Sequence, residues 1–526
     1  MNRRDAVKFV ASGLVLQTSQ SSTRAADPPM LSGFDVKTFG AKGDGKTLDT
    51  PAINKAIDAA AAIGGGTVIL PAGTYASYSI HLKSKVSLYL GPGATILAAD
   101  PPPPTGTGGY DDAEPMELDK YQDYGHSHFH NSLIWGEGLE DIGILGPGVI
   151  YGKGLSKGTG PGLRAEDPHV GNKAISLKNC RNVLLRDFAI LQGGHFGILA
   201  TGVDNFTIDN LRIDTNRDGM DIDCCRNVRV SNCTVNSPWD DAIVLKSSFG
   251  LGHARPTDMV TISNCMVSGS FALGSMLDGT FKPLPTGERI PRTGRIKFGT
   301  ESNGGFKNVT ITNCVFDGCQ GLALESVDGA IFEDVAISNI TMRDIITAPI
   351  FMRLGSRMRG PAGVPVGVMR RVVINNIICS NTAAYLGSII SGIPGHPIEN
   401  VKISDVYVQH QGGGTKENAA LAPTEKEDAY PEPGMFGTMP SHGFYIRHAK
   451  GIELSNIQIE TVKPDLRPVF VMNDVENVDL FRIKAAKVPD VPACVLTNVR
   501  NFTVSASKPL MPDAQVDRAD QARSDP

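Results

Sequence analysis

Apolar and polar residues alternate in short segments that recur along most of the chain. Each segment reads approximately Asn-Val-x-Ile-x-Asn, and an apolar side chain at every second position is typical of a β-strand with one buried face. The copies are NVLLRD at 182, NFTIDN at 205, NVRVSN at 227, MVTISN at 259, NVTITN at 308, DVAISN at 334, RVVINN at 371, NVKISD at 400, GIELSN at 451, NVDLFR at 477 and NFTVSA at 501. The shortest interval is 22 residues, and we interpret the longer intervals as loops.

A single six-residue strand cannot bury its apolar face alone, so the copies are expected to stack on one another. Repeats of this length with strands and no helical period predict an all-β fold, the right-handed parallel β-helix. A leucine-rich horseshoe has the same period, but its consensus is absent. The asparagine that closes each copy is expected at a tight bend, where its amide can bond to the backbone or stack in a ladder.

The open end of such a solenoid needs a cap. Residues 49–62, DTPAINKAIDAAAA, predict an N-terminal capping helix, with Asp49 or Thr50 as N-cap and Pro51 in the first turn. We expect one β-helix catalytic domain over 27–509, with inserted loops at 268–294 and 411–443 on the binding face. The polar tail over 510–526 is expected to be loosely held.

The first residues carry features of an export signal. Arg3-Arg4 precede a weakly apolar run, and small residues lie near Ala25-Ala26. Residues 1–26 are therefore predicted to be a twin-arginine-like signal, which places the mature protein in the periplasm or outside the cell. No later run reaches the roughly 20 apolar residues that span a bilayer, so we expect no membrane span.

Charge and cysteine content narrow the classes of partner. The net charge of −5 is not that of a nucleic-acid-binding protein. Among nine cysteines, Cys233, Cys265 and Cys314 each follow a repeat asparagine and are expected to form a buried ladder of thiols rather than disulfides. No pair of Cys-x-x-Cys type predicts zinc, so we expect no metal or cofactor, and a monomer that binds a polysaccharide or oligosaccharide.

Two clusters of acids are separated by the repeat length. Asp218 and Asp240 lie 22 residues apart, so stacking places them in adjacent coils, about 4.8 Å apart. With Asp241 they form a group of three carboxylates. Like charges this close raise at least one pKa, which supplies an acid and a base in one site. Aspartate is also common in bends, and the alternative is that these residues only form turns.

Several motifs resemble those of one enzyme family. FDVKTFGAKGDGKTLDT and GGGTVILPAGTY, which flank the predicted helix, resemble the N-terminal block of the pectate-lyase and polygalacturonase β-helix superfamily. NRDGMDID and DDAIVLKS resemble the Asn-Thr-Asp-Gly and Asp-Asp motifs of glycoside hydrolase family 28. This resemblance implies an inverting glycosidase in which Asp240 is the acid and Asp218 and Asp241 activate water. Inversion usually separates the carboxyls by roughly 6.5–9.5 Å, which is more than one coil spacing.

The chain differs from that family at the residues that bind the substrate in family members. The family's Gly-His-Gly is expected near Phe271, and no histidine occurs from there to 300. The family's Arg-Ile-Lys is expected where the chain reads ALE at 323–325, although GRIKFGTES occurs one coil earlier. Arg295 and Lys297 of that segment lie on the same side of a strand, where they either face a sugar acid or form a solvated pair.

Four other residues are weaker candidates for substrate binding. His195 either lines a subsite or is a buried, hydrogen-bonded histidine. Lys246 either orients the aspartates or neutralises them. Glu301 and Glu325 either accept hydrogen bonds from sugar hydroxyls or balance the arginines of the loop.

The leading hypothesis is hydrolysis of an α-glycosidic bond in a pectic polysaccharide, either rhamnogalacturonan or a modified or oligomeric galacturonan. One alternative is a Ca²⁺-dependent pectic lyase on the same scaffold, in which the aspartates bind the metal. The other is a β-helix that binds carbohydrate without catalysis. Lyases release unsaturated products, and a binding protein would tolerate loss of Asp240.

Overall fold

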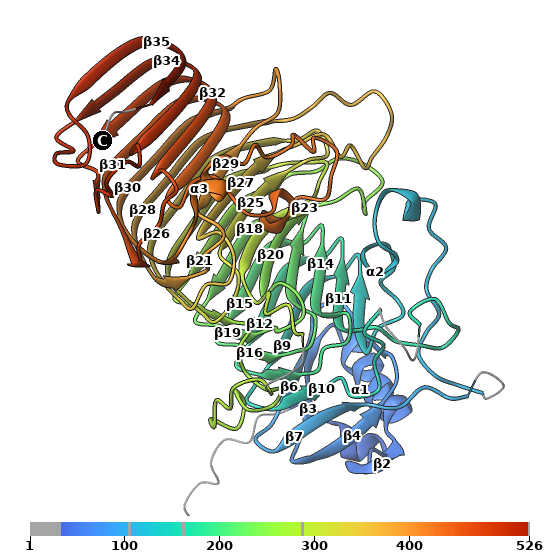
Figure 1. Ribbon diagram of the computed structural model, residues 1–526. Helices are drawn as coiled ribbons and strands as arrows, with labels where there is room; N and C mark the ends of the chain where they lie inside the picture. Colours follow the sequence, from blue (N-terminus) through green and yellow to red (C-terminus); the bar gives the residue numbers. More distant parts are fainter. Residues whose placement is uncertain (1–32, 104–106, 159–163, 286–288, 524–526) are drawn as a thin grey trace, which may run out of the picture.

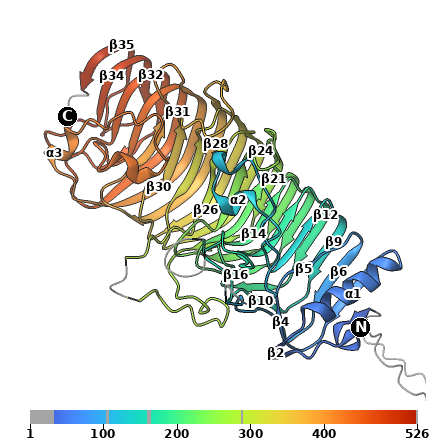
Figure 2. The same ribbon diagram turned by 90° about the vertical axis from the view of Figure 1, so that its right-hand side faces the viewer.

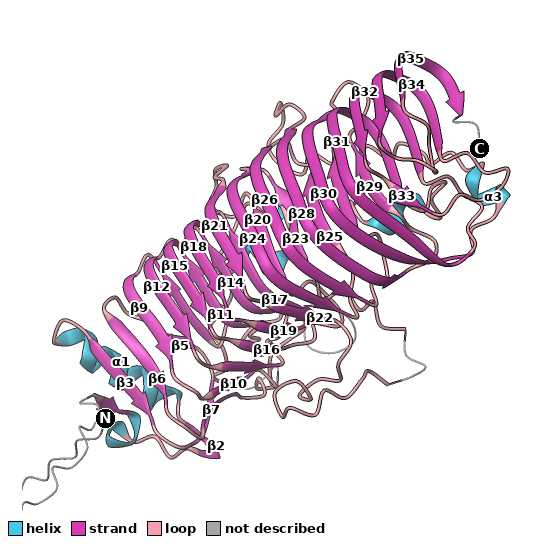
Figure 3. Cartoon of the chain, turned by 90° about the vertical axis from the view of Figure 1, so that its left-hand side faces the viewer, coloured by secondary structure: helices cyan, strands magenta, loops and turns pink. Residues whose placement is uncertain are grey.

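The computed structural model describes residues 33–103, 107–158, 164–285 and 289–523, which form one elongated right-handed parallel β-helix (Figure 1). The predicted fold is confirmed. The predicted export signal, residues 1–26, lies outside the described residues. The N-terminal and C-terminal parts of the chain lie at opposite ends of the body, and the strands succeed one another along its length (Figure 3).

Strands one coil apart pair in parallel and build three stacks. The first stack carries the site and contains β5 (Ile80–His81), β8 (Ile134–Glu137), β11 (Lys173–Lys178), β14 (Phe196–Thr201), β17 (Asp218–Asp223), β20 (Ile243–Ser247), β23 (Ile296–Ser302), β25 (Leu322–Ser326), β27 (Ile350–Leu354) and β29 (Ser388–Ser391). The second contains β1 (Phe34–Asp35), β3 (Gly66–Leu70), β6 (Val86–Leu90), β9 (Glu140–Leu145), β12 (Arg181–Arg186), β15 (Asp204–Asp209), β18 (Arg226–Ser231) and β21 (Thr257–Ser263). The third contains β2 (Asp44–Leu48), β4 (Gly73–Ser77), β7 (Ala94–Ala98), β10 (Val149–Tyr151), β13 (Ala189–Leu191), β16 (Arg212–Asp214), β19 (Thr234–Asn236) and β22 (Met266–Ser268).

In the C-terminal half, longer strands continue around the bends and join stacks. The second and third stacks merge into β24 (Phe306–Asp317), β26 (Ile331–Arg343), β28 (Val368–Thr382) and β30 (Ile398–Gly412). The last coils are β31 (Phe444–Lys463), β32 (Phe470–Phe481), β33 (Lys484–Ala485) and β34 (Cys494–Ser505). In these strands the side chains of the continuous apolar core lie two residues apart, as the alternation predicts, and three residues apart where a left-handed residue intervenes.

The asparagines at the bends adopt left-handed backbone conformations and stack in ladders. Asn339, which closes one repeat, has φ 57°, donates from its side-chain amide to Asn313 over 3.1 Å and accepts from Asn376 over 2.6 Å. The predicted ladder is therefore present. A second ladder, which the pattern did not reveal, runs through the residues that open the repeats: Asn205 donates to Asn182, and Asn227 donates to Asn205, both over 2.9 Å.

The helix α1 (Thr50–Ala62) lies at the N-terminal end of the rod (Figure 2) and buries an alanine and isoleucine face against the first coils. Asp49 occupies the N-cap position, as one of the two residues expected there, but its side chain makes no capping bond. The Asp49 carboxylate instead accepts hydrogen bonds from the backbone N–H groups of Lys42 and Gly43. Thr50 accepts a hydrogen bond from the backbone of Tyr78. The two residues that the sequence offers as N-caps thus hydrogen-bond the start of the helix to neighbouring segments of the chain.

The C-terminal segment is not the loosely held tail that its polarity suggests. Residues Ala514–Arg523 form β35, which pairs antiparallel with β34. Val516 and Ala519 lie in the antiparallel ladder opposite Phe502 and Val499. The expectation failed because β34 would otherwise leave an unpaired strand edge at the end of the solenoid, and even a polar segment gains backbone hydrogen bonds there.

The connections between strands include three short helices and several long loops. These helices are α2 (Tyr124–Ser127) and the 3-10 helix η2 (Asp119–Tyr121), both between β7 and β8, and α3 (Lys416–Ala419). Two further 3-10 helices are η1 (Val36–Phe39) and η3 (Pro433–Phe436). The loop from β30 to β31, residues 413–443, contains α3 and η3, and the loop from β22 to β23 covers 269–295. All nine cysteines are free and buried, as predicted for packed thiols.

Replacing Asn339 by alanine is expected to lower the free energy of unfolding by about 2 kcal/mol. The variant loses two ladder hydrogen bonds and forces an alanine into the left-handed region. Asn339→Gly is the matched control, because glycine adopts positive φ without a Cβ clash and should cost less. Urea unfolding of both variants measures the difference. Equal destabilisation by alanine and glycine would show that the backbone conformation contributes nothing.

Candidate active site

Three aspartate carboxylates meet at the edge of the first stack, where β17 and β20 begin. Asp218 is the first residue of β17, and Asp240 and Asp241 lie just before β20. One oxygen atom of each lies within 4.8 Å of the others. The structure therefore brings together the three acids that the repeat interval placed in neighbouring coils.

The pairing of β17 with β20 is shifted by one residue from the register that the repeat predicts. Met220 lies opposite Ile243, an offset of 23 residues, whereas β15 and β18 keep an offset of 22. The additional residue lies between β19 and β20, because β16 and β19 also keep 22. In the shifted register the residue that faces Asp218 in the next coil is Asp241 rather than Asp240. Asp240 is left in the bend between the two strands.

This placement makes Asp240 the most accessible acid of the three. Its side chain is 27% exposed, whereas Asp218 and Asp241 are each 4% exposed. Asp240 borders an open depression with a volume of about 410 Å³, which is lined by Lys157, Asn216, Arg217, Trp239 and Asp240. A polar substrate that enters this depression meets Asp240 first.

Arg217 holds the Asp240 carboxylate. Its Nη2 and Nε atoms donate to the same oxygen of Asp240, over 2.6 and 3.1 Å. Burial alone would lower the pKa of the guanidinium, but the Asp240 and Asp218 carboxylates raise it. Arg217 therefore remains a cation at the mouth of the site.

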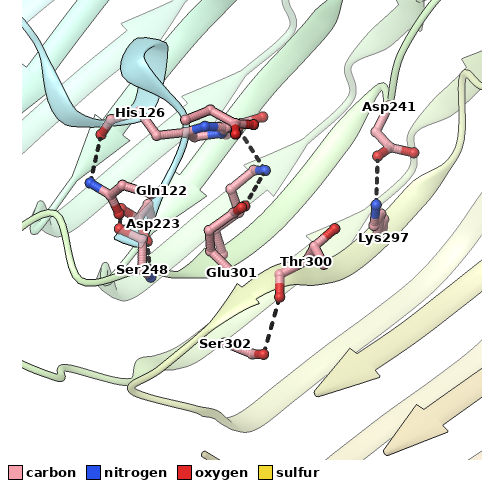
Figure 4. Close-up of polar contacts among 12 residues, drawn as sticks. Gln122, His126, Asp223, Asp241, Ser248, Lys297, Thr300, Glu301 and Ser302 are labelled. Carbon is pink, nitrogen blue, oxygen red and sulfur yellow. Dashed lines mark hydrogen bonds and ion pairs between the residues drawn. The ribbon is translucent and has the colours of Figure 1, made fainter. Parts of the chain in front are cut away.

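Asp241 is held on its other side by two buried cations from β23 and the residue before it. Arg295 Nε donates to one oxygen of Asp241 over 2.8 Å, and Lys297 Nζ lies 3.3 Å from the other oxygen (Figure 4). Burial would raise the pKa of Asp241, but the charges of Lys297 and Arg295 outweigh it and lower that pKa. Asp241 is thus held in its ionised form.

Asp218 has the opposite environment. Burial raises its pKa well above the ordinary value, and the neighbouring carboxylates of Asp240 and Asp221 raise it further. Lys246 and Arg217 oppose this shift only in part. The cluster therefore combines a carboxyl that retains a proton, Asp218, with a carboxylate that is ready to accept one, Asp241.

A second row of charged groups lies behind the aspartates, along the same stack. Lys246 Nζ lies 2.8 Å from Glu301 and 3.6 Å from Asp221, and His126 Nε2 lies 3.1 Å from Asp221 (Figure 4). Despite burial, the pKa of Glu301 is held well below its ordinary value, chiefly by Lys246 and then by His126. These groups compensate one another and need no contact with substrate.

The six predicted substrate-binding residues lie beneath the surface. Each is at most 7% exposed: His195, Lys246, Arg295, Lys297, Glu301 and Glu325. The solvated pair considered for Arg295 and Lys297 is wrong, because both cations are buried against Asp241. Lys246 neutralises the acids, which was one of its two expected roles. All six are buried in this arrangement, and Tyr430 and Glu432 of the loop between β30 and β31 lie on Arg295 and Lys297.

His195 fits neither of the two roles expected for it. Its ring stacks on Phe196, with centroids 4.1 Å apart, and neither ring nitrogen has a hydrogen-bond partner among the described residues. Burial, followed by the charge of Arg217, lowers its pKa well below the ordinary value. His195 is therefore a neutral packing residue beside the site rather than a ligand of the substrate.

Phe271, the position where the resemblance places the family's histidine, belongs to the loop from β22 to β23. Phe271 packs its ring on Phe281 within the loop from β22 to β23, and its carbonyl oxygen accepts a hydrogen bond from Asn236. Among the described residues, no histidine forms a hydrogen bond with Asp218, Asp240 or Asp241. Arginine and lysine surround the three acids instead.

The sequence interpretation missed three residues at the site. Arg217 stands where the family's Asn-Thr-Asp-Gly has threonine, so this departure was a visible signal. Trp239, one of two tryptophans, directly precedes Asp240. Glu432, whose carboxylate lies 2.6 Å from Arg295 Nη2, comes from the loop between β30 and β31. It is 137 residues away from its partner, and no local signal marks it.

Comparisons with known proteins agree with this architecture. A family model described as rhamnogalacturonase A/epimerase, pectate lyase-like, matches residues 33–124, and one described as a right-handed beta helix region matches residues 166–281. A probable polygalacturonase of Vitis vinifera is 22% identical over 454 residues, which cover 81% of this chain and 84% of that protein. The chain is a glycosidase that is similar to polygalacturonases.

One further curated protein and one solved structure that are similar to this glycosidase are described as exo-acting. An exo-poly-alpha-D-galacturonosidase of Dickeya chrysanthemi is 28% identical over 232 residues, which cover 43% of this chain and 36% of that protein. The structure of a family 28 exopolygalacturonase of Yersinia enterocolitica has a TM-score of 0.63 and 20% identity, and covers 86% of this chain and 79% of its own. That similarity shows the shared fold. None of the glycosidase's helices in the described ranges has the length and apolar character that a membrane crossing requires.

Replacing Asp218 by asparagine is expected to stabilise the glycosidase at pH 7. The folded protein raises the pKa of Asp218, so wild-type stability falls as the pH rises above about 4, where the unfolded chain ionises. The variant avoids this loss, and its advantage should shrink as the pH is lowered to 4. Urea unfolding at both pH values measures it.

Asp241→Asn is the matched control and should have the opposite sign. The folded pKa of Asp241 is lowered, so its contribution to stability is present at pH 7 and is lost as the pH falls through that lowered value. The variant should be less stable than wild type at pH 7, with a smaller difference in acid. If both variants shift stability in the same direction, the assigned protonation states are wrong.

Proposed function

We propose that the chain is an exported hydrolase that cleaves an α-glycosidic bond of a pectic polysaccharide, either rhamnogalacturonan or a modified or oligomeric galacturonan. The observation that carries this proposal is the cluster of three carboxylates, in which Asp240 faces an open depression beside Trp239. The relatives described as polygalacturonase and exo-poly-alpha-D-galacturonosidase support the class of substrate.

The protonation states suggest how the three acids divide the work. Asp240 transfers a proton to the leaving glycosidic oxygen, and Asp241 takes a proton from the water that attacks the anomeric carbon. Asp218 holds that water together with Asp241 and is the store of the proton that the cluster retains. Substrate that displaces Arg217 from Asp240 would let this proton pass to Asp240 and from there to the leaving oxygen. The proton that Asp241 takes from water then passes to Asp218, so that each turnover consumes one water and restores the cluster.

Inversion of configuration is the proposed outcome, although the acids are closer than usual. Inverting glycosidases generally separate acid and base by roughly 6.5–9.5 Å to leave room for the water. Here the water would lie beside Asp218 and Asp241 rather than between base and acid. The accessible Asp240 then approaches the sugar from the opposite face.

A lyase with Ca²⁺ on the same acids has one observation in its favour, because three clustered carboxylates resemble a cation site. Arg217, Arg295 and Lys297 already neutralise two of these acids at hydrogen-bond or ion-pair distance. A divalent ion would have to displace them or accept three positive charges nearby. The charge arrangement therefore favours hydrolysis.

The remaining parts of the proposal concern organisation. We propose that residues 27–509 form one catalytic domain and that the protein acts as a monomer. Export through the segment 1–26 would bring the enzyme to its polysaccharide. A fractionation of cells that express the full chain tests the export signal directly.

Asp240→Asn is expected to lower kcat by a factor of about 10² to 10⁴, because it removes the acid that protonates the leaving group. Release of reducing ends from a panel of pectic oligosaccharides measures the rate. Asp58→Asn, on the exposed face of α1, is the control and should retain wild-type activity. Unchanged activity in Asp240→Asn would support a non-catalytic binding protein instead.

The same reactions decide between the mechanisms. NMR of the first product is expected to show inverted anomeric configuration. Retention would contradict the role given to Asp218 and Asp241. Unsaturated products that absorb in the near ultraviolet and disappear on adding a chelator would replace the hydrolase proposal by the lyase.

Trp239→Ala is expected to raise KM about tenfold with little change in kcat. Trp239 is 36% exposed beside Asp240, where its ring offers a flat apolar face to a sugar ring. Trp239→Phe keeps an aromatic face and should lie close to wild type. Steady-state kinetics on one oligosaccharide measures both, and an equal loss of kcat in the two variants would contradict a binding role.

A further inference from the structure

The cation pair beside Asp241 is already occupied by a carboxylate from a distant loop. Glu432 Oε1 lies 2.6 Å from Arg295 Nη2 and 3.7 Å from Lys297 Nζ. Glu432 belongs to the segment 413–443, which enters between β30 and β31. This loop thus places an acid on the two positive charges nearest to Asp241.

The same loop covers the pair. The Tyr430 ring lies 5.5 Å from Lys297 Nζ, and its hydroxyl accepts a hydrogen bond from Thr300 over 2.9 Å. Arg295 is fully buried and Lys297 is 2% exposed. Glu432 itself is 33% exposed, so its charge, rather than theirs, faces the solvent.

Counting charges shows that Glu432 completes the balance. Arg295 and Lys297 carry two positive charges, and Asp241 and Glu432 supply two negative ones. Glu325, 3.6 Å from Lys297, is a third acid, and burial, with a contribution from Glu432, raises its pKa to about 8. At neutral pH Glu325 therefore adds little charge, and the pair has no net attraction left for another anion.

We propose that Glu432 determines specificity by taking the place of a substrate carboxylate, so that the sugar bound on the β23 side of Asp241 is uncharged. The inference rests on the proposed function, since it assigns a class of sugar to that same site. A uronate placed there would meet the Glu432 carboxylate and would have to displace it from Arg295. A neutral sugar or an esterified uronate meets no such repulsion.

The opposite side of the cluster differs in charge. Lys157 and Arg217 line the depression next to Asp240, toward the N-terminal coils. The two ends of the site therefore present unlike surfaces, one with the exposed Lys157 and the partly exposed Arg217, and one with cations covered by an acid. A saccharide with an uncharged unit at one position fits this asymmetry better than a uniform polyanion.

Glu432→Gln tests the proposal while keeping the size of the side chain. For matched pectic oligosaccharides with free or methyl-esterified carboxyls, the ratio of kcat/KM for the free acid to that for the ester should rise at least about tenfold over wild type, because the repelling charge is gone. Asp428→Asn is the control. It removes one charge from an exposed position of the same loop and should leave the ratio unchanged.

A binding measurement separates this inference from the proposed hydrolysis. Calorimetry with galacturonate and its methyl ester should show a gain of about tenfold in affinity for the free acid in Glu432→Ala, and none in Asp428→Asn. An unchanged ratio and unchanged binding in correctly folded Glu432 variants would overturn the role of Glu432. A gain in binding without hydrolysis by any variant would retain that role and refute the hydrolase.

Discussion

Backbone hydrogen bonding between successive coils is the constraint on which the whole molecule depends. It holds equivalent positions about 4.8 Å apart along the axis, so any side chain at a repeated position acquires neighbours of the same kind. Asparagines that recur at the bends form ladders, cysteines form a buried row, and aspartates form a cluster. The first two arrangements stabilise the stack without help. The third is a concentration of like charge that the fold imposes and that other groups must offset.

The offset comes from a chain of alternating charges along the first stack. Arg217 forms an ion pair with Asp240, and Arg295 and Lys297 form ion pairs with Asp241. Lys246 forms ion pairs with Asp221 and Glu301. Asp218 receives the least compensation and keeps its proton. Compensation is therefore unequal, and this inequality gives three chemically identical side chains different protonation states. If every aspartate had an equal share of cations, the stack would be more stable, but all three would be ionised and no protonated carboxyl would remain to act as an acid.

Local pattern was enough for the fold, because each strand carries its own alternation and its own bend residues. It was also enough to predict that Asp218, Asp240 and Asp241 lie together, because that prediction needs only the length of the repeat. It failed where one additional residue before β20 changed the register, because a period read elsewhere cannot reveal a local insertion. It failed again for burial: Arg295 and Lys297 lie on the expected side of their strand, but Glu432 and Tyr430 cover them from more than 130 positions later in the chain.

The bend between the second and third stacks carries a left-handed asparagine within continuous strands such as β26 and β28, namely Asn339 and Asn376. A left-handed residue inside a hydrogen-bonded ladder leaves no room for additional chain, because its neighbours above and below fix both ends. Changes in length are therefore directed to the connections that flank the first stack. During evolution, insertions and deletions can therefore change the loops around the catalytic aspartates, while the distance between these aspartates stays fixed. Chemistry and selectivity can then diverge at different rates on one scaffold.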